Sequence, residues 1–316
     1  MTNAETGQFT FAHPALLYRT QQEYLDCLLP FITESVKADA AVLVAVPGPN
    51  LALLDEALGS SADHVVMADM TLAGRNPGRI LGEVLSSFVE KHRDQPVRMV
   101  GEPIWPSRSE LEYPACVQHE ALINHAFTGR DVTVVCPYDV AQLDPDVIVD
   151  AHCTHPVLWQ HGSSEQDSPT FAPDEVWARY NQPLSSDPTA VKYTARNLAD
   201  LSGARAFAGA YAQWFGLPPR KTADLQLIAS ELATSSLTET GGPCRLALWR
   251  YDGHMVCEAR DGGYLDDPLT GRRPYGSDNA RGRGLYVVNA VADLVRTHSS
   301  PEATTIHAYL RLDETA

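Results

Sequence analysis

The sequence Gly282-Arg283-Gly284-Leu285 runs directly into Tyr286-Val287-Val288-Asn289-Ala290-Val291-Ala292-Asp293. The spacing of the apolar residues in the second segment predicts a helix. A glycine-rich turn before a helix leaves backbone N–H groups free at the positive helix end, where a phosphate is favoured. Asp261-Gly262-Gly263 lies upstream. Because glycine occurs in any tight turn, this stretch alone does not establish a phosphate site. The segments around it supply the further evidence.

The segments around this stretch have periodicities that predict both helices and strands. In chain order, we expect helices at residues 198–215 and 222–237, strands at 244–249 and 255–260, a helix at 284–294, and strands at 295–298 and 304–312. This order predicts an α/β sandwich in which one mixed sheet carries helices on one face.

The predicted second helix carries Glu231 and Ser235, which lie one turn apart on the same face. An acid on a helix, then Asp261-Gly262-Gly263 after a strand, then Gly282-Arg283-Gly284 before a helix resemble the N, G1 and G2 boxes of the Bergerat (GHKL, histidine kinase-like) ATPase fold. More narrowly, their order and spacing resemble anti-sigma-factor serine kinases. The resemblance covers residues 191–313.

The resemblance implies ATP and Mg²⁺ as cofactors and Glu231 as the catalytic base or water-positioning acid. It implies that the Asp261 carboxylate accepts the adenine amino hydrogens. The nucleotide-binding residues that it implies are Ser235, Asp261, Gly263, Arg281, Gly282, Arg283, Gly284 and Leu285. The lid between the two glycine boxes either neutralises phosphate charge or forms a solvated basic loop, through Arg272, Arg273, Arg281 and Arg283.

The chain departs from the family pattern at three positions. Ser235 stands where the family has the Asn that ligates Mg²⁺, and a serine hydroxyl reaches less far. Thr238 and Glu239 stand where the family has a basic residue and a His. Glu239 places negative charge beside the expected triphosphate. Either nucleotide binding is weakened, or the lid arginines compensate.

The N-terminal half alternates between predicted helices and strands. Residues 40–46 form a short apolar run stopped by Pro47-Gly48-Pro49, which is typical of a strand buried on both faces of a parallel sheet. Further strands are expected at residues 64–67, 96–101 and 131–136, with helices at 18–36, 50–58, 77–92, 113–127 and 145–152. This order predicts a parallel, doubly wound α/β domain.

Ligands in such domains bind beyond the carboxyl ends of the strands. The segment PGPNLALL after the first predicted strand lacks the pattern GxxxxGKS or GxxxxGKT, so we expect no phosphate-binding loop. The candidates for a sensor pocket are Asp69, Glu102, Trp105, His119, Glu120, Cys136, Tyr138 and Asp139. Capping and core filling are the alternative roles. Residues of the types that bind zinc or haem occur without the spacing of a dedicated metal motif at Cys116, His119, Cys136, His152, Cys153 and His155.

Several separated motifs in this half resemble the MEDS sensory domain. They are His13-Pro14-Ala15-Leu16-Leu17-Tyr18-Arg19, Val46-Pro47, Ala68-Asp69-Met70, Gly74-Arg75-Asn76-Pro77, Gly101-Glu102-Pro103-Ile104-Trp105, His119-Glu120-Ala121-Leu122 and Cys136-Pro137-Tyr138-Asp139. The resemblance covers residues 9–160. It implies a RecA-like or KaiC-like fold without a working P-loop, and a domain that senses an unidentified small molecule.

Composition limits the partners. The formal net charge of −16 repels phosphate backbones and anionic lipid, and no basic run offsets it, so we expect no direct nucleic acid or membrane partner. The six cysteines lack CxxC spacing, and the first residues lack a basic segment followed by an apolar one, so we expect a cytoplasmic protein with reduced thiols. Residues 161–190, rich in Ser, Pro, Asp and Gln, predict a linker whose aromatic residues pack along a domain surface.

Two functions remain open from the sequence. In the first, a ligand-sensing domain controls a kinase-like domain that binds a sigma factor or phosphorylates an anti-sigma antagonist. In the second, the C-terminal domain is a pseudokinase that acts only by protein contact. A sensor histidine kinase is disfavoured because the helix at residues 201–215 contains no phospho-acceptor His. The resemblance to anti-sigma kinases also implies a homodimer.

Overall fold

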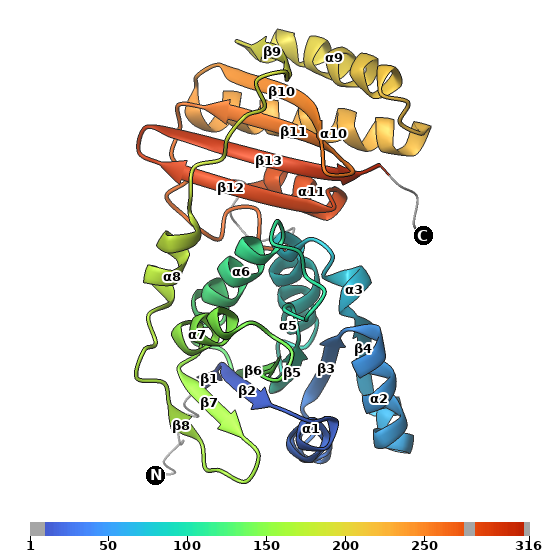
Figure 1. Cartoon of the computed structure of the whole chain (residues 1–316), viewed down its shortest axis with the longest axis vertical. Helices are drawn as coiled ribbons and strands as arrows, with labels where there is room; N and C mark the ends of the chain where they lie inside the picture. The colour runs from blue at the N-terminus through green and yellow to red at the C-terminus, as the bar shows by residue number, and fades with distance from the viewer. Residues whose placement is uncertain (1–9, 275–281, 313–316) are drawn as a thin grey trace, which may run out of the picture. The chain divides into compact units, whose positions relative to one another are not determined.

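The computed structural model describes residues 10–274 and 282–312 (Figure 1). It divides into two compact units. One comprises residues 1–74 and 85–177, and the other comprises residues 75–84 and 178–316. Both units mix helices and strands, as the sequence predicts, and each has its own sheet.

The N-terminal unit is built on an eight-stranded sheet with the order β4-β3-β5-β6-β2-β7-β8, and β1 also pairs with β6. The strands are β1 (Phe11–Ala12), β2 (Pro14–Tyr18), β3 (Ala41–Val46), β4 (Val65–Asp69), β5 (Val97–Gly101), β6 (Val132–Asp139), β7 (Val157–Gln160) and β8 (Gln166–Asp167). All pairings are parallel except that of β7 with β8. The expected parallel sheet is therefore present.

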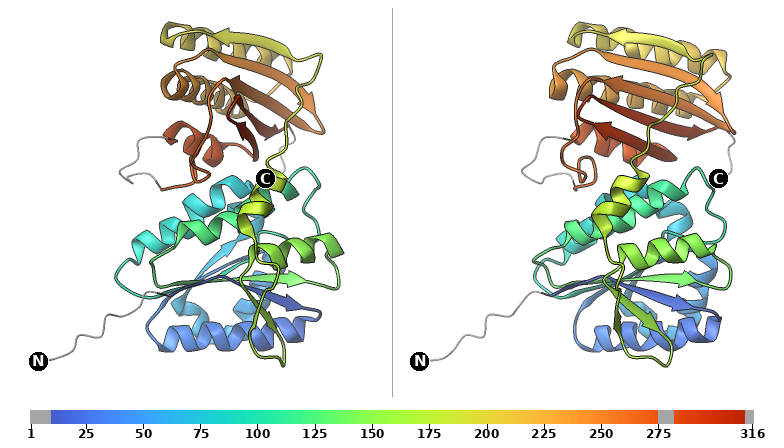
Figure 2. Two further views of the ribbon diagram at one scale, coloured as in Figure 1. Left: turned by 90° about the vertical axis from the view of Figure 1, so that its left-hand side faces the viewer. Right: turned by 60° about the vertical axis from the view of Figure 1, so that its left-hand side comes forward.

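The helices of this half of the chain are α1 (Gln21–Lys37), α2 (Gly48–Leu58), α3 (Met70–Ala73), α4 (Pro77–Arg79), α5 (Ser87–Lys91), α6 (Tyr113–Ala126), α7 (Pro145–Thr154) and α8 (Pro173–Tyr180), with a 3₁₀ turn at Gly59–His64 and a π-helical turn at Ile80–Ser86. Helix α1 starts where the Thr20 hydroxyl accepts a hydrogen bond from the Glu23 N–H. Figure 2 shows α1 on one face of the sheet and α6 and α7 on the other. Because both faces are covered, β3 is buried along its whole length.

Three features of this half differ from the sequence prediction. Strand β2 lies in the middle of the sheet, although its five residues gave no separate strand signal before α1. The helix expected at residues 77–92 is divided into α4, a π-helical turn and α5. The expected linker contains α8, whose Val176 is fully buried, and whose Asp174 lies 2.8 Å from the ring of His125 at the end of α6.

The C-terminal unit has a five-stranded sheet with the order β12-β13-β11-β10-β9. Its strands are β9 (Val191–Ala195), β10 (Cys244–Tyr251), β11 (His254–Asp261), β12 (Leu294–Ser300) and β13 (Ala303–Arg311). Every pairing is antiparallel, so the expectation of a mixed sheet was wrong. The connections explain the difference, because β10–β11 and β12–β13 are hairpins and neighbouring strands join without parallel crossovers.

Three helices cover one face of this sheet, α9 (Leu201–Trp214), α10 (Pro219–Ser235) and α11 (Arg283–Val291), as Figure 2 shows. Their apolar stripes form one core with the sheet, around residues such as Ala208, Ile228 and Val288. A 3₁₀ turn at Leu198–Asp200 precedes α9, and a π-helical turn at Ser236–Thr240 extends α10. The π-helical turn ends at Gly241, which has a φ of 67°.

The described residues contain no helix that combines the length and the apolar character needed to cross a membrane.

Candidate functional site

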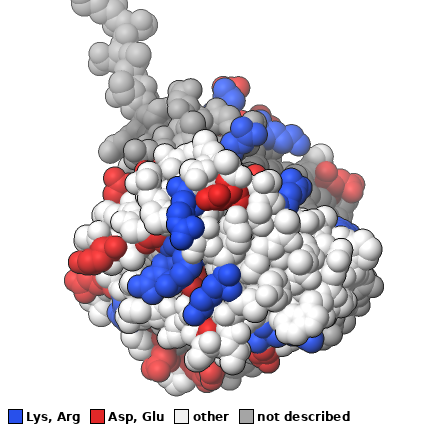
Figure 3. Space-filling view, turned by 90° about the horizontal axis from the view of Figure 1, so that it is seen from above, with Lys and Arg blue, Asp and Glu red and all other residues white. Residues whose placement is uncertain are grey.

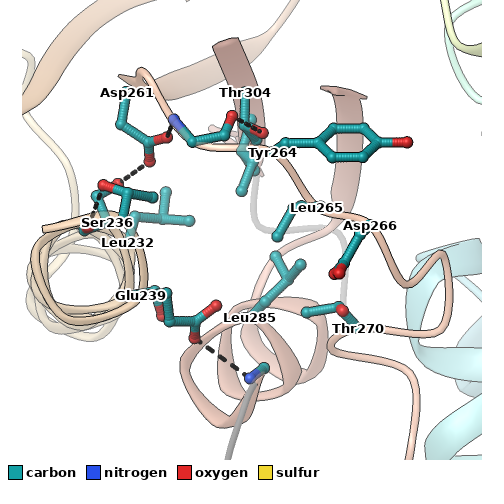
Figure 4. Close-up of a pocket in the computed structure, with 15 residues that line it drawn as sticks. Leu232, Ser236, Glu239, Asp261, Tyr264, Leu265, Asp266, Thr270, Leu285 and Thr304 are labelled. Atoms are coloured by element: carbon teal, nitrogen blue, oxygen red, sulfur yellow. Dashed lines mark hydrogen bonds between the residues drawn. The ribbon is translucent and has the colours of Figure 1, made fainter. Parts of the chain in front are cut away.

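The first pocket lies in the C-terminal unit, between the π-helical turn after α10, the end of β11 and the start of α11 (Figure 4). Its volume is about 200 Å³. Its floor is apolar, from Leu232, Leu285 and Ile306. An apolar floor with a few polar groups around it is typical of a small-molecule site.

Asp261, at the end of β11, is held in place by two hydrogen bonds. One carboxylate oxygen accepts from the Ser236 hydroxyl, and the other accepts from the Gly263 N–H at 2.8 Å. Thr304 faces Asp261 in the neighbouring strand β13 and donates to the Gly263 carbonyl at 2.9 Å. The acceptor that the resemblance assigns to adenine is therefore fixed in orientation and lines the pocket (Figure 4).

Gly263 passes close to the π-helical turn. A Cβ placed on Gly263 would lie 2.1 Å from the Thr240 methyl group and 3.1 Å from an Asp261 oxygen. No side chain fits in that space, so the close approach of the two segments requires glycine at this position. Ser236, Thr240 and Thr304 also line the pocket, although no sequence motif indicates them. Only the π-helical turn and the register of β11 with β13 bring them to the pocket.

The other end of the pocket is the start of α11. Gly282 caps this helix with a φ of 81°, and its N–H points at the Glu239 carboxylate, with N and Oε1 3.3 Å apart (Figure 4). Gly284 packs against α10, since a Cβ there would lie 2.4 Å from the Ser235 hydroxyl and 3.2 Å from a Glu231 carboxylate oxygen. The structure thus brings Glu231, Ser235 and Gly284 together, although Glu231 does not line the pocket.

The charge of the pocket decides which ligand fits. Its lining contains three carboxylates, from Glu239, Asp261 and Asp266, and no Lys or Arg among the residues that the structure describes. The N–H at the helix end, which the family uses for phosphate, donates to Glu239 instead. Among the described residues, the pocket lining therefore offers carboxylate acceptors but no cationic side chain to a ligand.

The lid arginines do not line this pocket in the part of the chain that is described. Arg272 is buried, and burial lowers the pKa of its guanidinium to about 10. Arg273 pairs with Asp267. Arg283 is exposed at the first turn of α11. Arg281, the fourth predicted arginine, lies outside the described residues.

A second pocket, of about 430 Å³, lies in the N-terminal unit at the carboxyl ends of β2, β3, β5 and β6. The helices that follow β3 and β5 cover opposite faces of the sheet, which opens a crevice between these strands. Of the predicted sensor residues, Glu102, Trp105 and Asp139 line it. Tyr24 and Asn50 line it as well, although no sequence motif indicates them.

Glu102 is the most unusual group in this pocket. Its side chain is 3% exposed and accepts two hydrogen bonds from the Asn50 amide, at 2.9 and 3.1 Å, and one from the Tyr24 hydroxyl at 3.4 Å. Burial, together with the charge of Asp139, raises the pKa of Glu102 to about 8, although the hydrogen bonds from Asn50 and Tyr24 oppose the rise. Glu102 is therefore largely neutral at pH 7 and can donate a hydrogen bond to a ligand.

The other predicted sensor residues do not line this pocket. Asp69 caps α3 and accepts from the Thr71 N–H and hydroxyl at 2.9 and 2.7 Å, which is the capping role. His119 is buried in α6. Glu120 and Cys136 lie in a separate buried cluster with His13 and His155. The Tyr138 ring packs edge-on against His155 at 5.5 Å.

Comparisons with known proteins agree with this division. Residues 12–156 match the family model described as "MEthanogen/methylotroph, DcmR Sensory domain" (MEDS). Residues 194–310 match the family model described as "Histidine kinase-like ATPase domain". The chain therefore contains a MEDS domain followed by a histidine kinase-like ATPase domain, as its motifs predict.

More distant comparisons add little. No curated protein matches the chain. Among solved structures, the chain is similar to one titled "The crystal structure of SiaB-SiaC complex from Pseudomonas aeruginosa". The match has 14% identity and a TM-score of 0.32, and it covers 38% of this chain and 88% of the other.

Proposed function

We propose that this protein is a signalling regulator in which the MEDS domain senses a small molecule and the ATPase-like domain acts by binding a partner protein, without phosphate transfer. The observation that carries this proposal is the hydrogen bond from the Gly282 N–H to the Glu239 carboxylate. A side-chain carboxylate takes the place that a phosphate needs, and it adds a negative charge there.

The family resemblance supplies the class of partner. Anti-sigma-factor kinases bind a sigma factor or an anti-sigma antagonist, and we propose a partner of one of these two kinds. The protein's surface is compatible with protein contact. Figure 3 shows Lys and Arg beside Asp and Glu on one face, together with wide areas that carry no charge. On α9, the Trp214 side chain is 72% exposed, and aromatic residues are enriched where proteins bind one another.

The chemistry of the second pocket supports a small polar molecule as the sensed ligand. Tyr24 and Trp105 offer aromatic surface, and Asn50 and Glu102 offer donors and acceptors. A largely neutral Glu102 can exchange hydrogen bonds with a hydroxyl or carbonyl group.

Capture of the partner tests the proposal. We expect the full-length protein to retain a sigma factor or an anti-sigma antagonist from its native cell extract equally well with and without Mg²⁺-ATP. The retained protein, identified by mass spectrometry, should carry no new phosphate. A partner that binds only in the presence of ATP, or that leaves phosphorylated on serine, would show an active kinase instead.

A further inference from the structure

Four side chains that can ligate a metal converge inside the MEDS domain, away from the pocket described above. This buried cluster consists of His13, Glu120, Cys136 and His155. One ligand atom of each lies within 4.8 Å of those of the others, and none of the side chains is more than 1% exposed. Clusters of this composition in a protein core are rare unless their charges are compensated.

The fold brings the cluster together from distant parts of the chain. Strand β2 lies between β6 and β7, with Ala15 opposite Cys136 and Pro14 opposite Val157. This register places His13 beside Cys136 and His155, and Glu120 reaches the same point from α6. The four ligand atoms therefore lie between the sheet and α6.

Three of the distances between the ligand atoms are close to those of a tetrahedral site. The Glu120 Oε2 atom lies 3.2 Å from His13 Nε2 and 3.3 Å from His155 Nε2. Cys136 Sγ lies 3.4 Å from His13 Nε2. A tetrahedral zinc ion with bonds of about 2.0–2.3 Å separates its ligands by about 3.3–3.8 Å. Because all four ligand atoms lie within 4.8 Å of one another, shifts of these side chains can bring them to the distances of a metal site.

The hydrogen bonds around the cluster orient both imidazoles toward its centre. His13 Nδ1 lies 3.2 Å from the Asn124 side-chain oxygen, and the Asn124 amide nitrogen donates to the Thr154 carbonyl at 2.8 Å, which fixes that orientation. His155 Nδ1 donates to the Ala151 carbonyl at 2.9 Å. With the proton on Nδ1 in both rings, each Nε2 presents a lone pair to the cluster, as in metal-bound histidines.

With both imidazole protons on Nδ1, the Cys136 thiol supplies the one remaining proton among these four side chains, and it lies against His13 Nε2. Neither Glu120 oxygen nor His155 Nε2 has a hydrogen-bond partner among the described residues, although they lie close together. Acceptors that face one another in a dry core repel, whereas a cation would satisfy them all. One thiolate and one carboxylate would also balance the two charges of a divalent ion.

We propose that the buried cluster binds one divalent metal ion of the zinc type through all four side chains. Two imidazoles, a thiolate and a carboxylate are the donor set that Zn²⁺ prefers. Because the protein fills all four positions, the ion ties β2, β6 and β7 to α6 and stabilises the domain. Without a metal, the same residues would form a buried network of ion pairs.

Cobalt substitution tests this proposal on the tag-free, full-length protein. We expect the protein purified from zinc-supplemented cells to retain one Zn²⁺ per chain by mass spectrometry. Exchange for Co²⁺ should give visible bands of tetrahedral cobalt and a near-ultraviolet thiolate-to-cobalt band. Cys136→Ser should abolish the thiolate band, while Cys116→Ser, at another buried cysteine of the same domain, should keep it.

The proposal is overturned if the native protein retains no stoichiometric metal and gives no tetrahedral cobalt spectrum after exchange. It is also overturned if Cys136→Ser keeps the thiolate band, since the metal would then lie elsewhere. If Cys136→Ser does not fold, Glu120→Gln provides the second test, and we expect it to weaken zinc retention at least tenfold against a chelator.

Discussion

Glu239→Lys is expected to raise the affinity of the full-length protein for Mg²⁺-ATP about 30-fold. The change removes the carboxylate that accepts from the Gly282 N–H and places a positive charge at the same point. Two unit charges about 4 Å apart near a protein surface interact by about 4 kcal/mol. Glu239 is exposed, so solvent and salt reduce that value by about half.

Calorimetric titration of the native and Glu239→Lys proteins at the same ionic strength measures the change. Glu239→Gln removes the charge without reversing it, so its affinity should lie between the two. Asp252→Asn is the control for the Gln variant, because it removes one negative charge in the turn at the far end of β11 from Asp261. If Glu239→Lys leaves ATP affinity unchanged, Glu239 does not block the phosphate position.

Relative to the native protein, the Glu102→Gln protein is expected to be about 4 kcal/mol more stable at pH 8.5 than it is at pH 4. Burial raises the pKa of Glu102 from 4.5 to about 8 in the folded state. A raised pKa stabilises the folded state fully below the unfolded pKa, and this stabilisation is lost as pH rises through the folded pKa. Glutamine has no such titration, so the loss occurs only in the native protein.

Urea unfolding of both proteins across this pH range, followed by tryptophan fluorescence, gives the difference in the free energy of unfolding. Glu56→Gln, at an exposed position of α2, is the matched control and should follow the native curve. Parallel curves for the native and Glu102→Gln proteins would mean that Glu102 titrates normally and is charged in the pocket.

The sequence predicted those helices and strands whose own residues show a clear apolar pattern. Residues 40–46 form a continuous apolar run, and this run became the buried strand β3. Strand β2 was missed because Pro14–Tyr18 is short and directly precedes a helix. Strand β9 was missed because it is short, largely half-buried and pairs with one strand only. Such strands are recognised through their pairing partners, which are distant in sequence.

The site residues also divide into those that local motifs predict and those that only pairing between distant strands brings together. Asp261, Gly263 and Gly282 stand in short motifs, and these three residues line the pocket of the C-terminal unit. Thr304 reaches that pocket only through its register opposite Asp261. His13 joins Cys136 and His155 only because β2 inserts between β6 and β7. Spacing along the chain contains no information about this insertion.

The most direct test of the central claim is calorimetric titration of the native full-length protein with Mg²⁺-ATP and, separately, with adenosine. We propose that the adenine end of the pocket is intact and that Glu239 closes the phosphate end. ATP should therefore bind no more tightly than adenosine, and no phosphate should be transferred to a captured partner. Micromolar affinity for ATP, well above that for adenosine, together with phosphate transfer to that partner, would contradict the account.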